Sequence, residues 1–472
     1  MLALGARGAL HTARHRGVDL SATTPRLSTS LLVLFALPTL PMFLLRGPAF
    51  SILPALYAER FGITLTVISG VLLAVRLADG VIDLAVGWGT DATRNRWGGR
   101  KSWFLVGSLA TVACIFQLYV PPSTATAAYF GLWFFIAYVA WTLNEIPYGA
   151  WAAELTNDYR ERNRIAAARQ YFNVASALLL GVMPFLPFMK SQEINFELLE
   201  VVAWTVALSL PPISLLAVWL VPHGTAVVRS GGESLKASWT AVRGNRPAWR
   251  FLGAAALAGL ADACSAGLGF MVIDSYFGLK AAASIMLIQW VVASMLGVWL
   301  ATRLLRRFDK HHLFVAAALL TAVMLLVNSA LTPQTPHLMA MYLSLSFLLI
   351  MCSAVTDMLP QSMVGDLVDY DEWKTRAQRA GQYVALLAFV RKATFGLGSA
   401  LSIFIAGSFG FEPGRPSYDT AAAIGLKLGM FWLPMVLMLA AAALMWGYPI
   451  GAKRHRAIQV RIQRRASPSS PA

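Results

Sequence analysis

The sequence has few charged residues and few cysteines for its length. Charged side chains make up only 13% of the 472 residues, whereas hydrophobic ones make up 57%. A water-soluble chain of this length would carry about twice that share of charge. The three cysteines, Cys114, Cys264 and Cys352, lie far apart in apolar stretches, which argues against a disulfide framework and against a cysteine-based metal site.

Sequence patterns typical of enzymes are also missing. The chain has no Gly-x-x-x-x-Gly-Lys phosphate loop, no zinc-binding histidine pair at positions i and i+4 of a helix, and no Gly-x-Ser-x-Gly turn. We interpret His311 and His312 as solvated residues of a basic loop. We therefore expect no enzymatic activity and no cofactor.

Long apolar runs fill most of the chain. Twelve of them can each cross a hydrocarbon layer about 30 Å thick at 1.5 Å per residue. We place them at 29–57, 65–91, 101–121, 126–155, 168–190, 201–221, 249–277, 281–305, 312–332, 337–366, 380–409 and 422–448. This pattern predicts an all-α polytopic membrane protein with twelve transmembrane helices in two six-helix bundles.

The distribution of basic residues sets the expected orientation. They gather in the N-terminal tail, in every second loop and at the C-terminus, which gives a net charge of +16. Since basic loops stay on the inner side of a membrane, both termini should be cytoplasmic, in the cell inner membrane. This explanation of the charge leaves no reason to expect nucleic-acid binding. We expect a monomer that contacts lipid.

The longest polar stretch between the apolar runs divides them six and six. We expect a cytoplasmic tail (1–28), a first bundle (29–221), a cytoplasmic linker (222–248), a second bundle (249–448) and a second cytoplasmic tail (449–472). The Arg-rich, acid-poor start is also compatible with a transit peptide. The halves repeat short motifs in matching order, as transporters often do: Glu154 to Tyr159 and Gln170-Tyr171, against Asp366 to Tyr370 and Gln382-Tyr383.

Three charged residues interrupt the second apolar run: Arg76, Asp79 and Asp83. The two carboxylates are four residues apart and share one face of a helix. A carboxylate at the centre of a bilayer costs roughly 2.5–3.5 kcal/mol on insertion scales, so this face should point into the bundle.

The fourth apolar run adds Thr142 and Glu145, which share a face, next to Pro147. Together with Asp79 and Asp83 they would form an all-oxygen pocket for Na⁺ or a shared proton. The alternative is a structural network in which arginines such as Arg76, Arg46 and Arg391 neutralise the acids.

Other polar residues in the apolar runs are candidates for substrate binding. Arg46 carries a planar fork suited to a carboxylate or phosphate, or it pairs with Glu145 or Asp79. The charged residues Asp262, Asp357 and Arg391-Lys392 line the cavity or form a gate or packing pair. The aromatic residues Trp133, Trp141, Tyr148 and Trp151 stack on a sugar or belong to the interfacial belt.

The basic loop after the second run follows Asp91 and contains Arg94 and Arg100. We interpret these residues, with Asp369 in the matching place of the second half, as a cytoplasmic clamp. Such a clamp would shift the equilibrium between the outward-facing and inward-facing conformations without touching the substrate.

These motifs together resemble the glycoside–pentoside–hexuronide:cation symporters of the major facilitator superfamily, which include the melibiose permeases. The resemblance covers nearly the whole chain and rests on Leu37-Pro38, Pro41, Leu53-Pro54-Ala-Leu-Tyr57-Ala, Arg76-x-x-Asp79-x-x-x-Asp83, Thr142-x-x-Glu145-Ile-Pro147, Asp366-Leu-Val-Asp369-Tyr370-Asp371-Glu372 and Lys392.

The resemblance implies a cation site of Asp79, Asp83, Glu145 and Thr142, and it places Lys392 at the helix 11 lysine. The galactoside determinants differ: Phe43 stands where the family has an acid, Gly149 where it has a tryptophan, and Arg169 lies one place from the helix 5 arginine, whose strict position is Gln170. We therefore list Arg46, Lys392, Arg169, Asp357 and Trp141 as substrate-binding candidates.

The resemblance implies symport, by alternating access, of a small-molecule solute such as a sugar, glycoside or hexuronide with Na⁺ or H⁺. Galactoside recognition does not carry over to this sequence. The guanidinium of Arg46 instead favours an acidic solute such as a hexuronide. A proton-linked exporter or uniporter of another small solute, and a lysolipid transporter, are the alternatives.

Overall fold

A computed structural model describes residues 27–93, 99–156, 158–222, 245–376 and 379–466. Within these ranges the chain is helical without strands, and twelve helices are long and apolar enough to cross a membrane. The predicted fold class is therefore confirmed. Arg94 and most of the predicted linker lie outside the described residues.

The first half contains α2 (Thr29–Ala36), α3 (Thr39–Ser51), α4 (Leu53–Phe61), α5 (Leu65–Ala92), α6 (Arg100–Tyr119), α7 (Ala127–Glu154), α8 (Tyr159–Val182), η1 (Met183–Phe185) and α9 (Phe196–Leu220). The second half contains α11 (Arg246–Met271), η2 (Val272–Tyr276), α12 (Lys280–Leu304), α13 (Lys310–Ser329), α14 (Leu338–Thr375), α15 (Ala380–Ser408), α16 (Thr420–Lys427), η3 (Leu428–Trp432), α17 (Leu433–Met445) and α18 (Ala452–Ala466).

Some helix boundaries differ from the predicted runs. α8 begins at Tyr159, nine residues before the predicted start, and α14 ends at Thr375, nine residues after the predicted end. Hydropathy marks only the part of a helix that lipid or apolar packing surrounds, so polar extensions of the same helix escape it.

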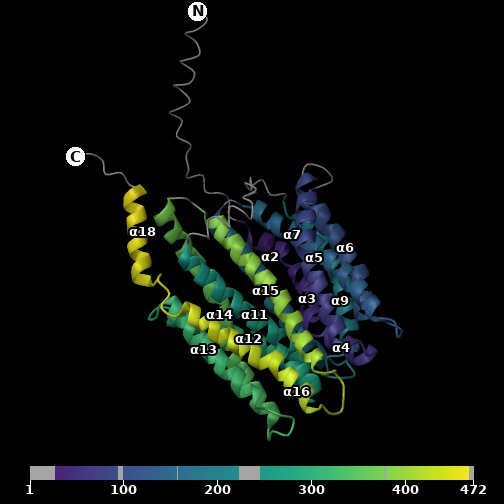
Figure 1. The fold of residues 1–472 in the computed structure, drawn as a ribbon. Coiled ribbons are helices and arrows are strands. Elements are labelled where there is room, and N and C mark those ends of the chain that lie inside the picture. Colours follow the sequence, from purple (N-terminus) through teal and green to yellow (C-terminus); the bar gives the residue numbers. More distant parts are fainter. Residues whose placement is uncertain (1–26, 94–98, 157, 223–244, 377–378, 467–472) are drawn as a thin grey trace, which may run out of the picture.

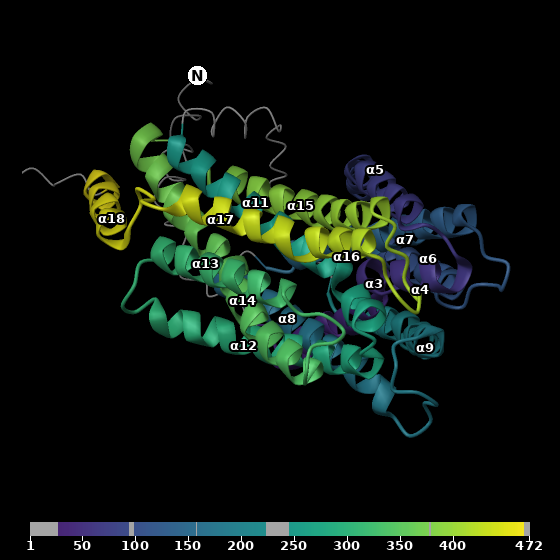
Figure 2. The same cartoon turned by 60° about the horizontal axis from the view of Figure 1, so that its bottom comes forward.

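The two halves lie side by side, with α15 of the second half next to α5 of the first (Figure 1). We call the end with Leu27 and α18 the proximal end, and the end with α4 and α16 the distal end (Figures 1 and 2). α5 runs from the distal to the proximal end, and α15 runs back, so the pair is antiparallel.

The halves are sealed together at the distal end. A methyl group built on Gly407 of α15 would come within 2.8 Å of Cβ of Leu65 at the start of α5. On the other side of the molecule, one built on Gly181 of α8 would come within 2.8 Å of Ile288 in α12. A single buried apolar cluster includes first-half side chains and the distal parts of α11 and α15. A second cluster belongs to the second half alone.

A further helix, α18, follows the last span in the region that the sequence predicts to be a cytoplasmic tail. α18 lies across the proximal end of the second half and packs against α14 (Figures 1 and 2). Its Ile458 is buried, and its His455 contacts Asp369 at 2.7 Å. Apolar residues at 458 and 462 among basic ones were the signal that could have predicted this amphipathic helix.

Candidate functional site

The charged residues of α5 lie on the face that points into the protein. Asp79 is only 2% exposed, whereas Leu77 and Val81 on the opposite face are 68% and 70% exposed. Arg76, Asp79 and Asp83 recur at spacings of three and four, which keeps them on one side of the helix. The carboxylates therefore turn away from the surface that would meet lipid, as the sequence predicts.

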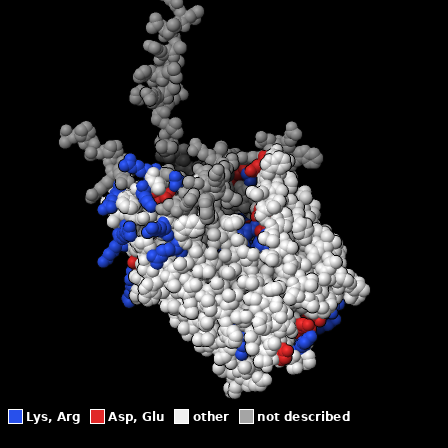
Figure 3. All heavy atoms as spheres, viewed as in Figure 1, with Lys and Arg blue, Asp and Glu red and all other residues white. Residues whose placement is uncertain are grey.

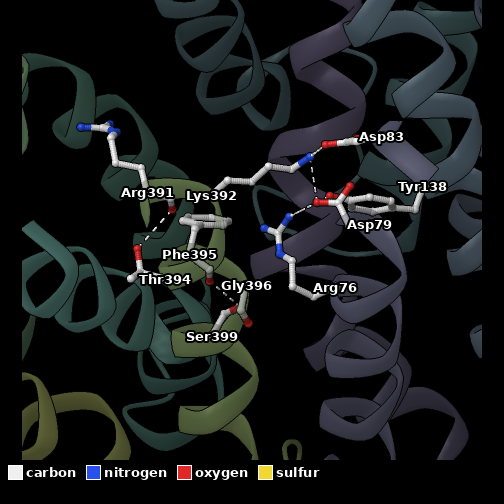
Figure 4. Close-up of polar contacts among 10 residues, drawn as sticks. All are labelled: Arg76, Asp79, Asp83, Tyr138, Arg391, Lys392, Thr394, Phe395, Gly396 and Ser399. Carbon is white, nitrogen blue, oxygen red and sulfur yellow. Dashed lines mark hydrogen bonds and ion pairs between the residues drawn. The ribbon is translucent and has the colours of Figure 1, made fainter. Parts of the chain in front are cut away.

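Lys392 of α15 joins both carboxylates from the other half of the chain (Figure 4). Its Nζ lies 2.8 Å from Oδ2 of Asp79 and also pairs with Oδ2 of Asp83. The sequence makes Lys392 a candidate for substrate binding, and no local pattern indicates that it contacts the acids of α5.

Arg76 is the fourth charged residue of the cluster formed with Asp79, Asp83 and Lys392. Its Nη1 donates to Oδ2 of Asp79 at 3.0 Å and to the hydroxyl of Tyr138 on α7 at 2.7 Å. Thus two cations share one oxygen of Asp79. The other oxygen, Oδ1, is buried and has no hydrogen-bond partner among the described residues.

A glycine makes the approach of α5 and α15 possible. Any side chain at Gly396 would overlap Nε, Cγ and Cδ of Arg76, so the α15 backbone leaves room for the arginine only without a Cβ (Figure 4). The sequence offered a weak signal, since Gly396-Leu-Gly398 places two small residues in an apolar helix, where they allow close packing.

Glu145 of α7 belongs to a separate ion pair. Its Oε1 lies 3.4 Å from Nη2 of Arg169 on α8, and the Arg169 guanidinium also lies over the ring of Tyr148 at 4.4 Å. Thr142 is buried, but none of the described residues forms a hydrogen bond with it. In this conformation Glu145 and Thr142 therefore do not join Asp79 and Asp83 in one polar cluster.

Arg46 is exposed in α3, and its guanidinium lies 5.5 Å from the ring centroid of Trp141 on α7. Among the described residues it forms no salt bridge. The sequence-based alternative that Arg46 neutralises Glu145 or Asp79 is wrong for this conformation, because Glu145 pairs with Arg169 and Asp79 with Arg76 and Lys392.

The second half has an ion pair of its own next to Lys392 in the chain. Arg391 of α15 pairs with Asp357 of α14 at 2.7 Å, and it points away from Lys392 (Figure 4). Asp262 of α11 lies near Ser353 and near both partners. Asp357 is exposed, so this pair is not packed in a core.

The clamp candidates at the proximal end form ion pairs within their own halves. Arg100 is shared by Asp91 and Glu154, at 2.9 Å from each. Asp369 pairs with His455 of α18. Figure 3 shows charged groups in the hollow between the two halves. It also shows a basic surface over the proximal end of the second half.

The fold and this charged crossing between two helical halves define a secondary transporter of the major facilitator type. A family model described as "MFS/sugar transport protein" matches residues 34–452. The chain belongs to this family, which confirms the relationship to the glycoside–pentoside–hexuronide:cation symporters inferred from its motifs.

Curated relatives and solved structures agree with this assignment. The "Glucuronide carrier protein homolog" of Escherichia coli (strain K12) is 24% identical over 87% of this chain and 90% of its own. The "Putative sulfoquinovose importer" of Salmonella typhimurium (strain LT2) is 25% identical over 72% of this chain and 70% of its own. The structure of the nucleoside transporter NupG has the same fold, with a TM-score of 0.63 at 14% identity over 89% of this chain and 99% of its own.

Proposed function

We propose that the protein is a symporter of the cell inner membrane that couples Na⁺ or H⁺ to the import of an acidic sugar derivative. The termini are cytoplasmic in this proposal, so the proximal end faces the cytoplasm. The distal seal and the exposed charges between the halves then correspond to an inward-facing state of an alternating-access cycle.

One observation carries the proposed cation site: the unpartnered, buried Oδ1 of Asp79. A buried carboxylate oxygen without a partner is costly, and a small cation or proton would remove that cost. Asp83, one helical turn away, supplies further oxygens once Lys392 releases it. Hard cations prefer such an oxygen set.

The same geometry suggests how binding is coupled to movement. Lys392 is the link between α15 and both acids of α5, so it holds the halves together while no cation is bound. A cation at Asp79 and Asp83 competes with the Lys392 ammonium for the same oxygens. Release of Lys392 would then loosen the α5–α15 crossing and permit the other conformation.

Arg46 supports an acidic substrate. It is an exposed guanidinium beside an aromatic ring, and an acidic sugar offers both a carboxylate or sulfonate for the fork and an apolar ring face for Trp141. The names of two relatives, a glucuronide carrier homolog and a putative sulfoquinovose importer, also denote acidic sugars. Arg169 is less available, because it pairs with Glu145.

Uptake of radiolabelled glucuronide into inverted and right-side-out vesicles tests the coupling. We expect accumulation driven by a Na⁺ gradient or by an acidic exterior in the wild type. Asp79→Asn should lose accumulation while keeping substrate exchange, because the charge that binds the cation is gone. Full gradient-driven accumulation by Asp79→Asn would overturn the cation site, and gradient-independent wild-type uptake would favour a uniporter.

A paired comparison of substrates tests the acidic class. Arg46→Ala should weaken binding of a glucuronide at least tenfold, since a charge-assisted bidentate pair contributes about 1.5–3 kcal/mol. Binding of the matching neutral glucoside should change little. Arg60→Ala is the control, because that exposed arginine also lies over aromatic rings but at the distal end. Equal losses for acidic and neutral sugars would reject Arg46 as the anion-binding group.

A further inference from the structure

A cluster of potential metal ligands lies at the proximal start of α13, remote from the charged crossing. Asp309 precedes the helix, and His311 and His312 are in its first turn. The prediction that both histidines are solvated is wrong for His311, which is only 6% exposed, whereas His312 is exposed.

The three side chains converge. One ligand atom from each residue lies within 4.8 Å of the others, and the two imidazole rings are 4.0 Å apart at their centroids. In addition, Nδ1 of His311 is buried without a hydrogen-bond partner among the described residues. A buried polar nitrogen normally has a partner, and in the tautomer with its proton on Nε2 this one is free to bind a metal.

We propose that Asp309, His311 and His312 form a site for a divalent metal of the zinc class. Two imidazole nitrogens and one carboxylate are ligands typical of zinc, and a water can complete a tetrahedron. Zinc–nitrogen bonds of about 2.0–2.1 Å need donor atoms about 3.4 Å apart, so ligand atoms within 4.8 Å of one another must close by up to about 1.4 Å. The exposed ring of His312 is free to make this movement.

The adjacent Lys310 does not point toward this site. Lys310 turns its Nζ toward Asp366 on α14, at 2.8 Å, and toward the carbonyl oxygen of Ser362 at 3.0 Å. The carboxylate of Asp366 therefore balances the positive charge of Lys310 at a place away from the histidines. One oxygen of Asp309 accepts a hydrogen bond from the backbone of Ala452 at 3.3 Å, and the other oxygen faces Gly451.

These contacts place the proposed metal site where α18 begins. The Gly451 backbone lies against Asp309 and His311, and only a glycine leaves this space, since a methyl group would come within 2.8 Å of Oδ2 of Asp309. A metal that fixes Asp309 would therefore also hold the first residues of α18 against α13. This function is separate from transport of the solute.

Titration of the full-length protein with Co²⁺ and Zn²⁺ tests the site. The protein is purified in detergent with its affinity tag removed. We expect one Co²⁺ per chain with the visible absorption of a tetrahedral complex, displaced by Zn²⁺, and a higher melting temperature with Zn²⁺. His312→Ala and His311→Gln should each weaken metal binding at least tenfold.

The matched control is His223→Ala, which removes a histidine elsewhere in the chain. Because His312 is exposed, its alanine variant should fold even if a substitution at the buried His311 does not. Unchanged metal binding in His312→Ala would overturn the proposal. So would a loss in His223→Ala as large as the loss in His312→Ala, since the metal would then bind elsewhere.

Discussion

The two ends of the boundary between the halves are built from different interactions. At the distal end the halves touch through glycines, where Gly407 meets Leu65 and Gly181 meets Ile288. At the proximal end the ion pairs stay within one half, as Asp91, Arg100 and Glu154 do in the first. The Lys310–Asp366 ion pair and the His455–Asp369 hydrogen bond do the same in the second.

This difference indicates where the molecule is rigid and where it changes. Ion pairs within a half brace that half as one body, so it can rotate without breaking them. The distal seal depends on close packing of small residues, which is lost as soon as the backbones separate. The charged crossing of Arg76, Asp79 and Lys392 lies between these regions and belongs to both halves.

The largest effect should come from filling the space at Gly396. Gly396→Ala would displace Arg76, which cannot then reach Asp79 and Tyr138 as it does now. Overpacking of this kind costs about 2–3 kcal/mol, so the distally closed state should lose roughly 30- to 150-fold in population. Transport should fall accordingly, because the cycle needs that state.

A cysteine reporter measures the closure. Ser284 is buried under Gln192 at the distal seal, so Ser284→Cys in a chain whose three native cysteines are alanine should react slowly with an impermeant maleimide. Gly396→Ala should speed that reaction. Gly365→Ala, at an α14 glycine with open space around it, is the control. Equal rates in both variants would show that the crossing does not control the seal.

A smaller effect is expected from Lys392→Met. The substitution keeps the apolar stem but removes the ammonium that joins Asp79 and Asp83. Because Lys392 is 43% exposed, we expect a loss of about 1–2 kcal/mol in the closed state rather than the full cost of a buried pair.

In cation-free buffer the reporter should therefore react faster and the protein should melt earlier. Na⁺, or protonation at lower pH, should restore part of the melting temperature, since a cation then replaces the lysine between the carboxylates. Lys374→Met, on the exposed end of α14, is the charge-matched control. A Lys392→Met protein as stable as the wild type, with no response to either cation, would contradict the proposed competition.

Hydropathy and charge predicted the twelve spans because each is a local property of the chain. The inward face of α5 was also predictable, since Asp79 and Asp83 lie one turn apart on the same helix. The partners of these acids were not. Lys392 is 309 residues from Asp83 in sequence, and only the packing of α15 against α5 brings them together.

The same limit explains the errors at Glu145 and at His311. Which arginine pairs with Glu145 depends on how α3 and α8 pack against α7, which no local pattern reports, so the sequence predicted Arg46 and not Arg169 as an alternative partner. The sequence predicts His311 in a solvated basic loop, whereas it lies buried in the first turn of α13, with Gly451, the residue before α18, against it. Recognition of α18 as an amphipathic helix would have corrected the second error but not the first.

The smallest effect should come from the ion pair that crosses the distal end. Glu59 and Lys280 are 3.4 Å apart, and their side chains are 31% and 41% exposed. Water screens such a pair, so Lys280→Met should cost less than about 1 kcal/mol and change the Ser284→Cys reaction rate by less than about fivefold. High salt should reproduce this change in the wild type and have no further effect on the variant. If Lys280→Met instead opened the seal as much as Gly396→Ala, charge rather than close packing would hold the distal end, and the contrast between the two ends would fail.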